Sequence, residues 1–264
     1  MPDSKPLARP TNTIYLYDGS FEGFLCCVFV SVREKELPLN ILPETAAPTL
    51  FETRFILSDA EKAEGVRASI PKKISPRAWE LVTTVFCSCL ADKELHLIKF
   101  LLKGYREGGK ICNMLGDEVV APLLAAERRL LGEAHLLKGF VRFADAGGAL
   151  VAAITPKNYV LPFIARHFTL RFPREQFMIF DKTHKAALIH QNGEAEIISV
   201  DDVAFPEISE EEARYQELWK RFYNTIAIKG RENPRCRMTH MPKRYWQNML
   251  EVSDLVNPDK EYER

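Results

Sequence analysis

The stretch Gln176–Val200, QFMIFDKTHKAALIHQNGEAEIISV, decides the fold class of this 264-residue chain. It contains three short apolar runs that we predict as strands: Gln176–Asp181, Ala186–His190 and Ala195–Val200. The dipeptide Asn192-Gly193 joins the last two runs, and Asn-Gly is a strong signal for a two-residue β-hairpin turn. Because hairpin-connected strands pair antiparallel, the sequence indicates an α+β fold rather than a wound parallel sheet.

The N-terminal part of the chain alternates strand and helix patterns. Thr13–Tyr17 reads as a short strand, and the turn Asp18–Ser20 leads into Phe21–Arg33, which is apolar almost throughout and therefore predicts a buried helix. Leu50–Leu57 alternates well enough for a second strand. Ser58 is followed three residues later by a glutamate, a capping-box pattern that predicts the start of the next helix.

Helical periodicity dominates the middle of the chain. After it, we expect a hairpin of Phe140–Phe143 with Ala149–Ile154. The expected helices span Ser75–Tyr105, Asp117–Leu137, Tyr159–Phe168, Glu207–Ile228 and Pro242–Glu251. Together the elements predict one α+β domain over 1–264, with a mostly antiparallel sheet, packed helices and a C-terminal basic helical segment. Within it we expect a flexible N-terminus at 1–12, a mainly helical part at 58–137 and a flexible tail at 252–264.

Charge and cysteine content exclude several classes of protein. Lysine plus arginine and aspartate plus glutamate both number 36, so no net field draws the whole chain onto nucleic acid or anionic lipid. No apolar run is long enough to span a membrane, and the polar, proline-rich N-terminus lacks the apolar core of a secretory signal. The six cysteines form no C-x-x-C pair, so we expect a reduced, cytoplasmic protein without a cysteine-based metal site.

No familiar catalytic or cofactor-binding motif occurs in the sequence. The glycines of KGYREGGK at 103–110 lack the spacing and the preceding strand of a phosphate loop. Cys236 and His240 are four residues apart, but Pro234 and Pro242 bracket them, so we expect no continuous helix that presents both to a metal. We therefore assign no catalytic residue, no metal and no cofactor.

The main electrostatic feature lies near the C-terminus. Between Arg214 and Asn248, nine lysine and arginine residues stand against two glutamates, so this segment carries 9 − 2 = +7 on a neutral chain. Arginine binds phosphate in a bidentate manner, and tyrosine and tryptophan offer faces on which unpaired bases stack. The residues that we expect to bind nucleic acid are Lys229, Arg231, Asn233, Arg235, Arg237, His240, Lys243, Arg244, Tyr245 and Trp246. The alternative is a solvated, charged helix face.

Aromatic residues of this segment are expected to serve two purposes. Trp219, Phe222, Tyr223 and Ile226 recur at helical spacing, and most of them should pack in the core. Neighbours on a helix point about 100° apart, so one of Tyr245 and Trp246 should be buried and the other exposed.

Three longer stretches resemble a known family. They are YLYDGSFEGFLCCVF at 15–29, HFTLRFPREQFMIFD at 167–181 and LWKRFYNTIAIKGRENPRCRMTHMPKRYWQNMLE at 218–251. They are similar to a bacterial family of probable DNA-metabolism proteins with a domain of unknown function. The resemblance extends over residues 13–251, although only the helical character matches in 35–138.

The resemblance implies a partner rather than a reaction. Members of that family look like partners of a radical-SAM protein of DNA modification or repair, and some are fused at the C-terminus to a uracil-DNA glycosylase. This chain ends at Arg264, soon after the last motif, so we expect no such fusion. It also lacks the cysteine triplet that a radical-SAM protein itself needs.

The motifs that carry the resemblance also indicate a polar cluster. Its candidate members are Asp18, Ser20, Glu22, His167, Arg171 and Asp181, with Arg231 and Asn233 near the C-terminus. A carboxylate such as Asp18 could orient an arginine such as Arg231. For Asp18 and Ser20 the alternative is simple turn chemistry at a helix entry.

Three classes of function remain open. The favoured one is an accessory protein that binds DNA and a radical-SAM partner without chemistry of its own, because no set of nucleophile, base and metal is assembled. The second is a nucleic-acid-modifying enzyme that uses Asp18, His167 and Asp181. The third is a non-catalytic adaptor whose basic segment binds an acidic protein.

Overall fold

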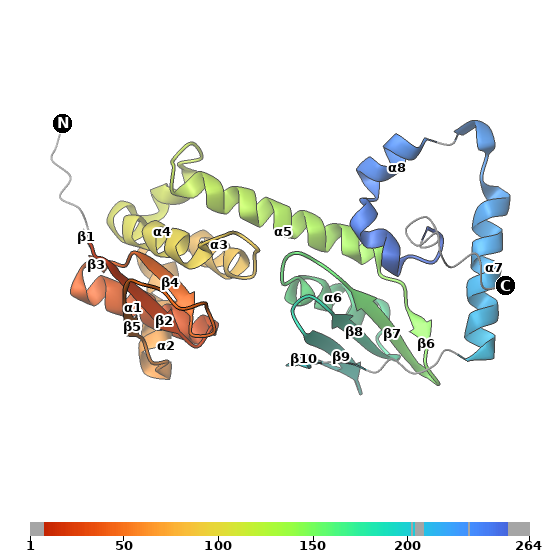
Figure 1. Ribbon diagram of the computed structural model, residues 1–264, viewed down its shortest axis with the longest axis horizontal. Helices are drawn as coiled ribbons and strands as arrows, with labels where there is room; N and C mark the ends of the chain where they lie inside the picture. Colours follow the sequence, from red (N-terminus) through yellow and green to blue (C-terminus); the bar gives the residue numbers. More distant parts are fainter. Residues whose placement is uncertain (1–7, 202, 204–208, 232, 253–264) are drawn as a thin grey trace. The chain divides into compact units, whose positions relative to one another are not determined.

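The structure, a computed structural model, describes residues 8–201, 203, 209–231 and 233–252 (Figure 1). The chain divides into two compact units, Met1–Leu130 and Leu131–Arg264, where the sequence predicted one domain. The boundary falls inside helix α5, Val120–Phe140. Each unit has its own sheet, its own helices and its own hydrophobic core, so the expected α+β class is confirmed.

The three-stranded sheet of the first unit is parallel. Its central strand β2, Thr13–Tyr17, lies between β4, Asn40–Pro43, and β5, Glu52–Phe55. Helix α1, Phe21–Glu34, follows β2 and supplies the crossover that a parallel neighbour needs. The strand at 13–17 and the helix after it are confirmed. The expected antiparallel pairing is wrong for this sheet, because the hairpin signals from which it was inferred lie only in the second unit.

The ends of the described chain are more ordered than the sequence predicted. β1, Arg9–Pro10, lies in the segment expected to be flexible and pairs in parallel with β3, Glu36–Leu37. At the other end, Val252 is buried in the core of the second unit. The remaining residues of the two predicted flexible segments include 1–7 and 253–264, which lie outside the described residues.

Several helices follow the sheet strands of the first unit, and one predicted helix is interrupted. The expected long helix over 75–105 is two helices, because Cys87 ends the first and Asp92 takes a φ of 49° before the second. Asp59 rather than Ser58 caps the preceding helix, since its side chain accepts the N–H of Lys62. These elements are α2, Ala60–Lys73, α3, Pro76–Phe86, α4, Lys93–Glu107, and the 3-10 helix η1, Gly108–Asn113.

The sheet of the second unit has the strand order β10-β9-β8-β7-β6. The bounds, in chain order from β6 to β10, are Ala144–Asp145, Ala149–Ile154, Gln176–Asp181, Ala186–Gln191 and Glu194–Ser199. The hairpin turn at Asn192-Gly193 is confirmed, with φ of 55° and 81°, since a type I′ turn needs positive φ at both positions.

Two features of this second sheet differ from expectation. Strands β7 and β8 are parallel, because helix α6, Leu161–Arg171, forms the crossover between them (Figure 1). The predicted strand Phe140–Phe143 is wrong, since Phe140 still belongs to α5 and the partner of β7 is the short β6. The sheet is therefore mixed, with antiparallel pairs at both edges.

Helices and 3-10 turns make up the C-terminal part of the second unit. The elements are α7, Glu210–Ile226, η2, Lys229–Arg231, α8, Pro234–His240, and η3, Lys243–Asn248. Ser209 caps α7 as predicted. The α8 helix was not expected, but Pro234 occupies its first turn, where proline is tolerated. Within the described part of the chain, no helix combines the length and the apolarity needed to cross a membrane.

Candidate nucleic-acid interface

Tyr245 and Trp246 lie in η3 and are both buried, with 2% and 5% of their surfaces exposed. The Tyr245 ring packs against Phe140 with ring centroids 5.6 Å apart, and Trp246 Nε1 donates to the Met241 carbonyl at 2.8 Å. The expectation that one of the two faces solvent is wrong. In the short 3-10 segment η3, Lys243, Arg244 and Gln247 are exposed, whereas Tyr245 and Trp246 both pack into the core of the second unit together with Met249. Neither ring is available for stacking on a base.

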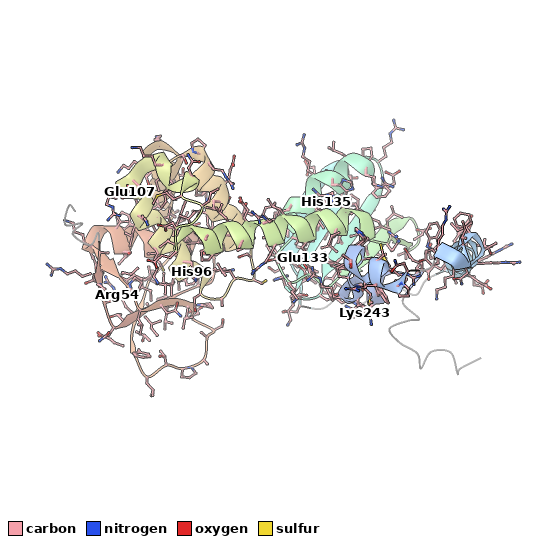
Figure 2. The ribbon with its side chains drawn as sticks, turned by 90° about the horizontal axis from the view of Figure 1, so that it is seen from above. Arg54, His96, Glu107, Glu133, His135 and Lys243 are labelled. Atoms are coloured by element: carbon pink, nitrogen blue, oxygen red, sulfur yellow. The ribbon has the colours of Figure 1, made fainter. Side chains whose placement is uncertain are left out.

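The buried carboxylate of Glu133 on α5 holds η3 in place. It accepts hydrogen bonds from the backbone N–H groups of residues 157 and 158 at 3.1 and 2.9 Å, and from Asn158 Nδ2 at 2.6 Å. The Tyr245 hydroxyl donates to it at 3.3 Å, and Arg244 Nη2 lies 3.3 Å away. Figure 2 shows Glu133 beside the segment that carries Lys243. A buried carboxylate needs such partners, so Arg244 serves the fold as well as the surface.

Further contacts tie the end of η3 to the second unit. Arg142 Nη2 donates to Glu251 Oε1 at 2.7 Å. Asn248 Nδ2 donates to Thr155 Oγ1 at 3.2 Å, and the Gln247 amide donates to the same oxygen. These contacts hold Gln247, Asn248 and Glu251 against the second unit.

Cations that are open to a ligand lie on α8. Asn233 caps this helix by accepting the N–H of Cys236 at 2.9 Å, and the helix continues to His240. Arg235 and His240 are exposed, and Arg237 is half-buried. Among the residues that the structure describes, no carboxylate pairs with either α8 arginine.

Two more predicted cations flank α8. Arg231, at the end of η2, is exposed, as is Lys243 at the start of η3. Lys243 Nζ lies over the Trp246 ring, 5.9 Å from its centre, which is within the range of a cation–π contact. Lys229 begins η2, and its side chain lies outside the described part of the structure.

Helix α7 exposes an apolar stripe that the sequence placed in the core. None of its described residues is buried. Trp219 and Phe222 are 42% and 53% exposed, with ring centroids 5.9 Å apart. The prediction of core packing is wrong because helical spacing determines which residues share a face, but not what lies opposite that face. The exposed stripe comprises Tyr215, Leu218, Trp219, Phe222 and Ile226.

The first half of the predicted polar cluster is a helix-capping arrangement in the first unit. Asp18 Oδ1 accepts the Ser20 N–H and hydroxyl at 2.9 and 2.7 Å, and its Oδ2 accepts the Ser58 hydroxyl at 2.6 Å. The Ser20 oxygen accepts the Gly23 N–H at 2.9 Å and so caps α1. Burial raises the pKa of Asp18, but the hydrogen bonds from Ser58 and Ser20 outweigh it and lower the pKa. Glu22 lies in the first turn, where a negative charge favours the helix dipole.

The second half of the cluster lies in the second unit and contains a pair that the sequence did not reveal. Asp181 is fully buried at the end of β8, where its Oδ1 accepts the N–H groups of Thr183 and His184 at 2.9 and 3.1 Å. His184 Nδ1 lies 2.7 Å from Asp181 Oδ2, and the His184 ring meets Tyr159 edge-on at 5.5 Å. The sequence did contain a signal for this pair, because the apolar strand ends in Asp181 and His184 follows three residues later.

His167 and Arg171 lie on α6 and not in this Asp181–His184 pair. The His167 ring meets Phe168 edge-on at 4.9 Å, and the Arg171 guanidinium lies 5.7 Å from the Phe172 ring centre. Burial lowers the pKa of His167, and the positive charges of Lys138 and Arg171 lower it further. In the described contacts of the second unit, the partner of Asp181 is therefore His184 rather than His167.

Comparison with known proteins concerns mainly the C-terminal part of the chain. A family model described as a domain of unknown function (DUF4130) matches residues 91–251, which is more than half of the chain. No curated protein and no solved structure matches the chain. The matched range contains Glu133, α7 and α8, whereas the Asp18–Ser20 turn lies before it.

Proposed function

The chain belongs to the DUF4130 family, and we propose that it is a nucleic-acid-binding accessory protein that binds through α7 and α8. One observation carries the proposal. Helix α7 exposes aromatic rings, and the exposed Arg231 and Arg235 follow it in the chain without a carboxylate partner among the described residues. Phosphates and unpaired bases are the groups that such a surface binds.

Phosphate contacts come from the cations on and beside α8. Arg231, Arg235, Arg237 and Lys243 supply about four contacts, since each neutralises one phosphate. On duplex DNA this number corresponds to a slope of log K against log salt of about −3 to −4. The binding is then weak and largely independent of sequence, because phosphate contacts carry no base information.

The aromatic rings of α7 favour single strands over duplex. Trp219 and Phe222 offer exposed faces, and stacking of an unpaired base on such a ring contributes about 1–3 kcal/mol. Bases within a duplex are already stacked and present no free face. The stacking role therefore belongs to α7 and not to the buried Tyr245 and Trp246.

The remaining part of the proposal, a role in DNA metabolism or repair beside a radical-SAM partner, is supported by the sequence resemblance. Co-expression with a radical-SAM protein of that kind, followed by co-purification, tests it directly. The enzyme alternative has less support, because Asp18 and Asp181 are each committed to hydrogen bonds of a helix cap and a turn.

Fluorescence anisotropy with a labelled single-stranded oligonucleotide over a salt series tests the interface. The double variant Arg235→Ala with Arg237→Ala should weaken binding and reduce the magnitude of the slope by about 1.4, because each lost contact removes about 0.7 on a single strand. The matched control is Arg128→Ala with Arg129→Ala, two exposed arginines of α5. An equal loss in both double variants, or binding that does not depend on salt, would contradict the proposed interface.

A further inference from the structure

Helices α1 and α2 of the first unit line a cavity of about 680 Å³ that is open to solvent on one side. Small-molecule sites in proteins have volumes of about 300–1,000 Å³ and mostly apolar linings. Apolar side chains of Phe29, Val32 and Val66 form much of this lining, and Tyr105 of α4 adds a phenol. The cavity thus has the size and the walls of a ligand site, and it lies away from the proposed nucleic-acid interface in the sequence.

The packing of α2 does not require the glycine at position 65, which lies on the cavity wall. Gly65 lies inside α2, where glycine costs about 0.5–1 kcal/mol relative to alanine. A Cβ added at Gly65 would meet no atom within 4 Å, so close packing does not demand the glycine. What Gly65 does provide is a stretch of wall without a side chain, which leaves room for a ring in a cavity that Phe29 and Tyr105 also line.

The polar groups of the cavity are arranged to receive a hydrogen-bond donor. The Ser69 hydroxyl donates to the Val66 carbonyl at 2.8 Å, and the Ser69 and Tyr105 oxygens are 2.6 Å apart. Because the only proton of Ser69 is used, Tyr105 donates to Ser69, and the lone pairs of the Tyr105 oxygen are left to accept. Burial raises the pKa of Tyr105, so the phenol keeps its proton at neutral pH.

A cation lies on the same face of α2 as Ser69. Lys73 is one helical turn farther on, lines the cavity and forms no ion pair with any described carboxylate. Lys62, by contrast, pairs with Asp59, and Arg33 pairs with Glu34. Glu61 lines the cavity at the N-terminal end of α2, about 18 Å from Lys73 at a rise of 1.5 Å per residue. A negative group is therefore favoured at the Lys73 end.

We propose that this cavity binds a small organic anion: a planar aromatic ring with an N–H or O–H donor that faces Tyr105, and one phosphate or carboxylate that faces Lys73. Mononucleotides and hydroxylated aromatic carboxylates share this chemistry. The proposal is independent of the nucleic-acid interface, since every residue that it uses lies in the first unit.

Saturation-transfer NMR and calorimetric titration of the full chain with adenosine 5′-monophosphate and with 4-hydroxybenzoate test the proposal. Binding of at least one probe is expected, and titration of both shows whether the ring is that of a nucleotide or of an aromatic acid. Adenosine, which lacks the phosphate, should bind about tenfold more weakly than the nucleotide. It loses one charged contact of about 1.4 kcal/mol, which corresponds to a tenfold change in affinity. No binding of either probe at millimolar concentration would overturn the proposal.

Two pairs of variants locate the binding. Gly65→Leu fills the cavity without a clash at Cβ, so it should abolish binding while the chain stays folded. Its control is Gly132→Leu, another glycine in a helix with open space around it. Lys73→Ala should weaken binding about tenfold, whereas Lys72→Ala, on the neighbouring exposed lysine, should not. Binding that survives both Gly65→Leu and Lys73→Ala would place the ligand elsewhere and refute the assignment.

Discussion

The hydroxyl of Tyr245 donates a hydrogen bond at 3.3 Å to the buried carboxylate of Glu133, 112 positions earlier in the chain. The same carboxylate receives Arg244 and the turn at Asn158. One acid in the middle of α5 therefore connects the loop after β7 with the C-terminal 3-10 segment. These contacts explain why Arg244 and Tyr245 are needed by the fold itself.

Glu133→Ala should destabilise the second unit by about 3–5 kcal/mol, because it leaves buried donors and a guanidinium without their acceptor. Glu133→Gln should cost less, since the amide keeps one acceptor oxygen. Urea unfolding monitored by circular dichroism measures both. Glu80→Ala, whose side chain is 67% exposed, should stay within about 0.5 kcal/mol of the unmodified chain. Equal effects of Glu133→Ala and Glu80→Ala would mean that the buried network does not contribute to stability.

The two tryptophans of the C-terminal part should respond oppositely to replacement by alanine. Trp246→Ala removes a buried side chain and should cost about 3–5 kcal/mol of stability. Trp219→Ala loses the hydrogen bond from Trp219 Nε1 to Glu251 at 3.5 Å, so it should cost at most about 1 kcal/mol of stability but weaken single-stranded DNA binding by about 1–3 kcal/mol. Thermal unfolding and anisotropy separate the two effects. If Trp219→Ala instead unfolds the chain, the α7 stripe is covered in solution and is not a stacking surface.

Two buried tyrosines on β2 allow a comparison of a hydroxyl that has a hydrogen-bond partner with one that has none in the described structure. Tyr17 donates to the buried Glu94 at 2.9 Å, whereas the Tyr15 hydroxyl is buried without a hydrogen-bond partner in the described structure. Tyr17→Phe should therefore cost about 1–3 kcal/mol, and Tyr15→Phe should be neutral or stabilise by up to about 1 kcal/mol. Chemical unfolding of both variants decides this, and a larger loss for Tyr15→Phe than for Tyr17→Phe would reverse the assignment.

The same tyrosines predict loss of stability at high pH. Burial, together with the negative charge of Glu36, raises the pKa of Tyr15 to about 12, and burial and Glu94 raise the pKa of Tyr17 as well. The unfolded chain releases these protons near pH 10, before the folded chain does. Their contribution to stability is thus complete below about pH 10 and is lost as the pH rises toward 12. Unfolding midpoints from pH 8 to 11.5 measure the decline, which should be shallower in Tyr15→Phe; an unchanged slope would exclude Tyr15 as a cause.

Two helical glycines should behave differently when a methyl group is added. A Cβ at Gly23 would lie 2.2 Å from Asp18 Oδ1, so Gly23→Ala should disrupt the cap of α1 and cost about 1–3 kcal/mol. Gly65→Ala meets open space and should stabilise α2 by about 0.5–1 kcal/mol. Differential scanning calorimetry of both variants checks the prediction. A stabilised Gly23→Ala protein would show that the Asp18 turn can move away at no cost.

Much of the local structure was predictable from the sequence. The strand at 13–17, the helix that begins at Phe21, the Ser209 cap and the Asn192-Gly193 hairpin are all observed as expected. Each depends on residues within a few positions of one another, through side-chain caps, positive φ at a turn or alternation along a strand. Ser58 shows the limit of this reasoning: its hydroxyl donates to Asp18, 40 positions away, and the adjacent Asp59 takes the cap.

By itself, the sequence determined where many of the helices, turns and strands form and where positive charge accumulates, because these properties are local. Only the tertiary structure decided which faces are covered. It buried Tyr245 and Trp246 together and left the apolar stripe of α7 exposed, although both segments carry large aromatic side chains. It also made the first sheet parallel and brought Glu133 to Tyr245. Burial and pairing depend on residues that lie opposite in space, and those residues come from distant parts of the chain that no local pattern identifies.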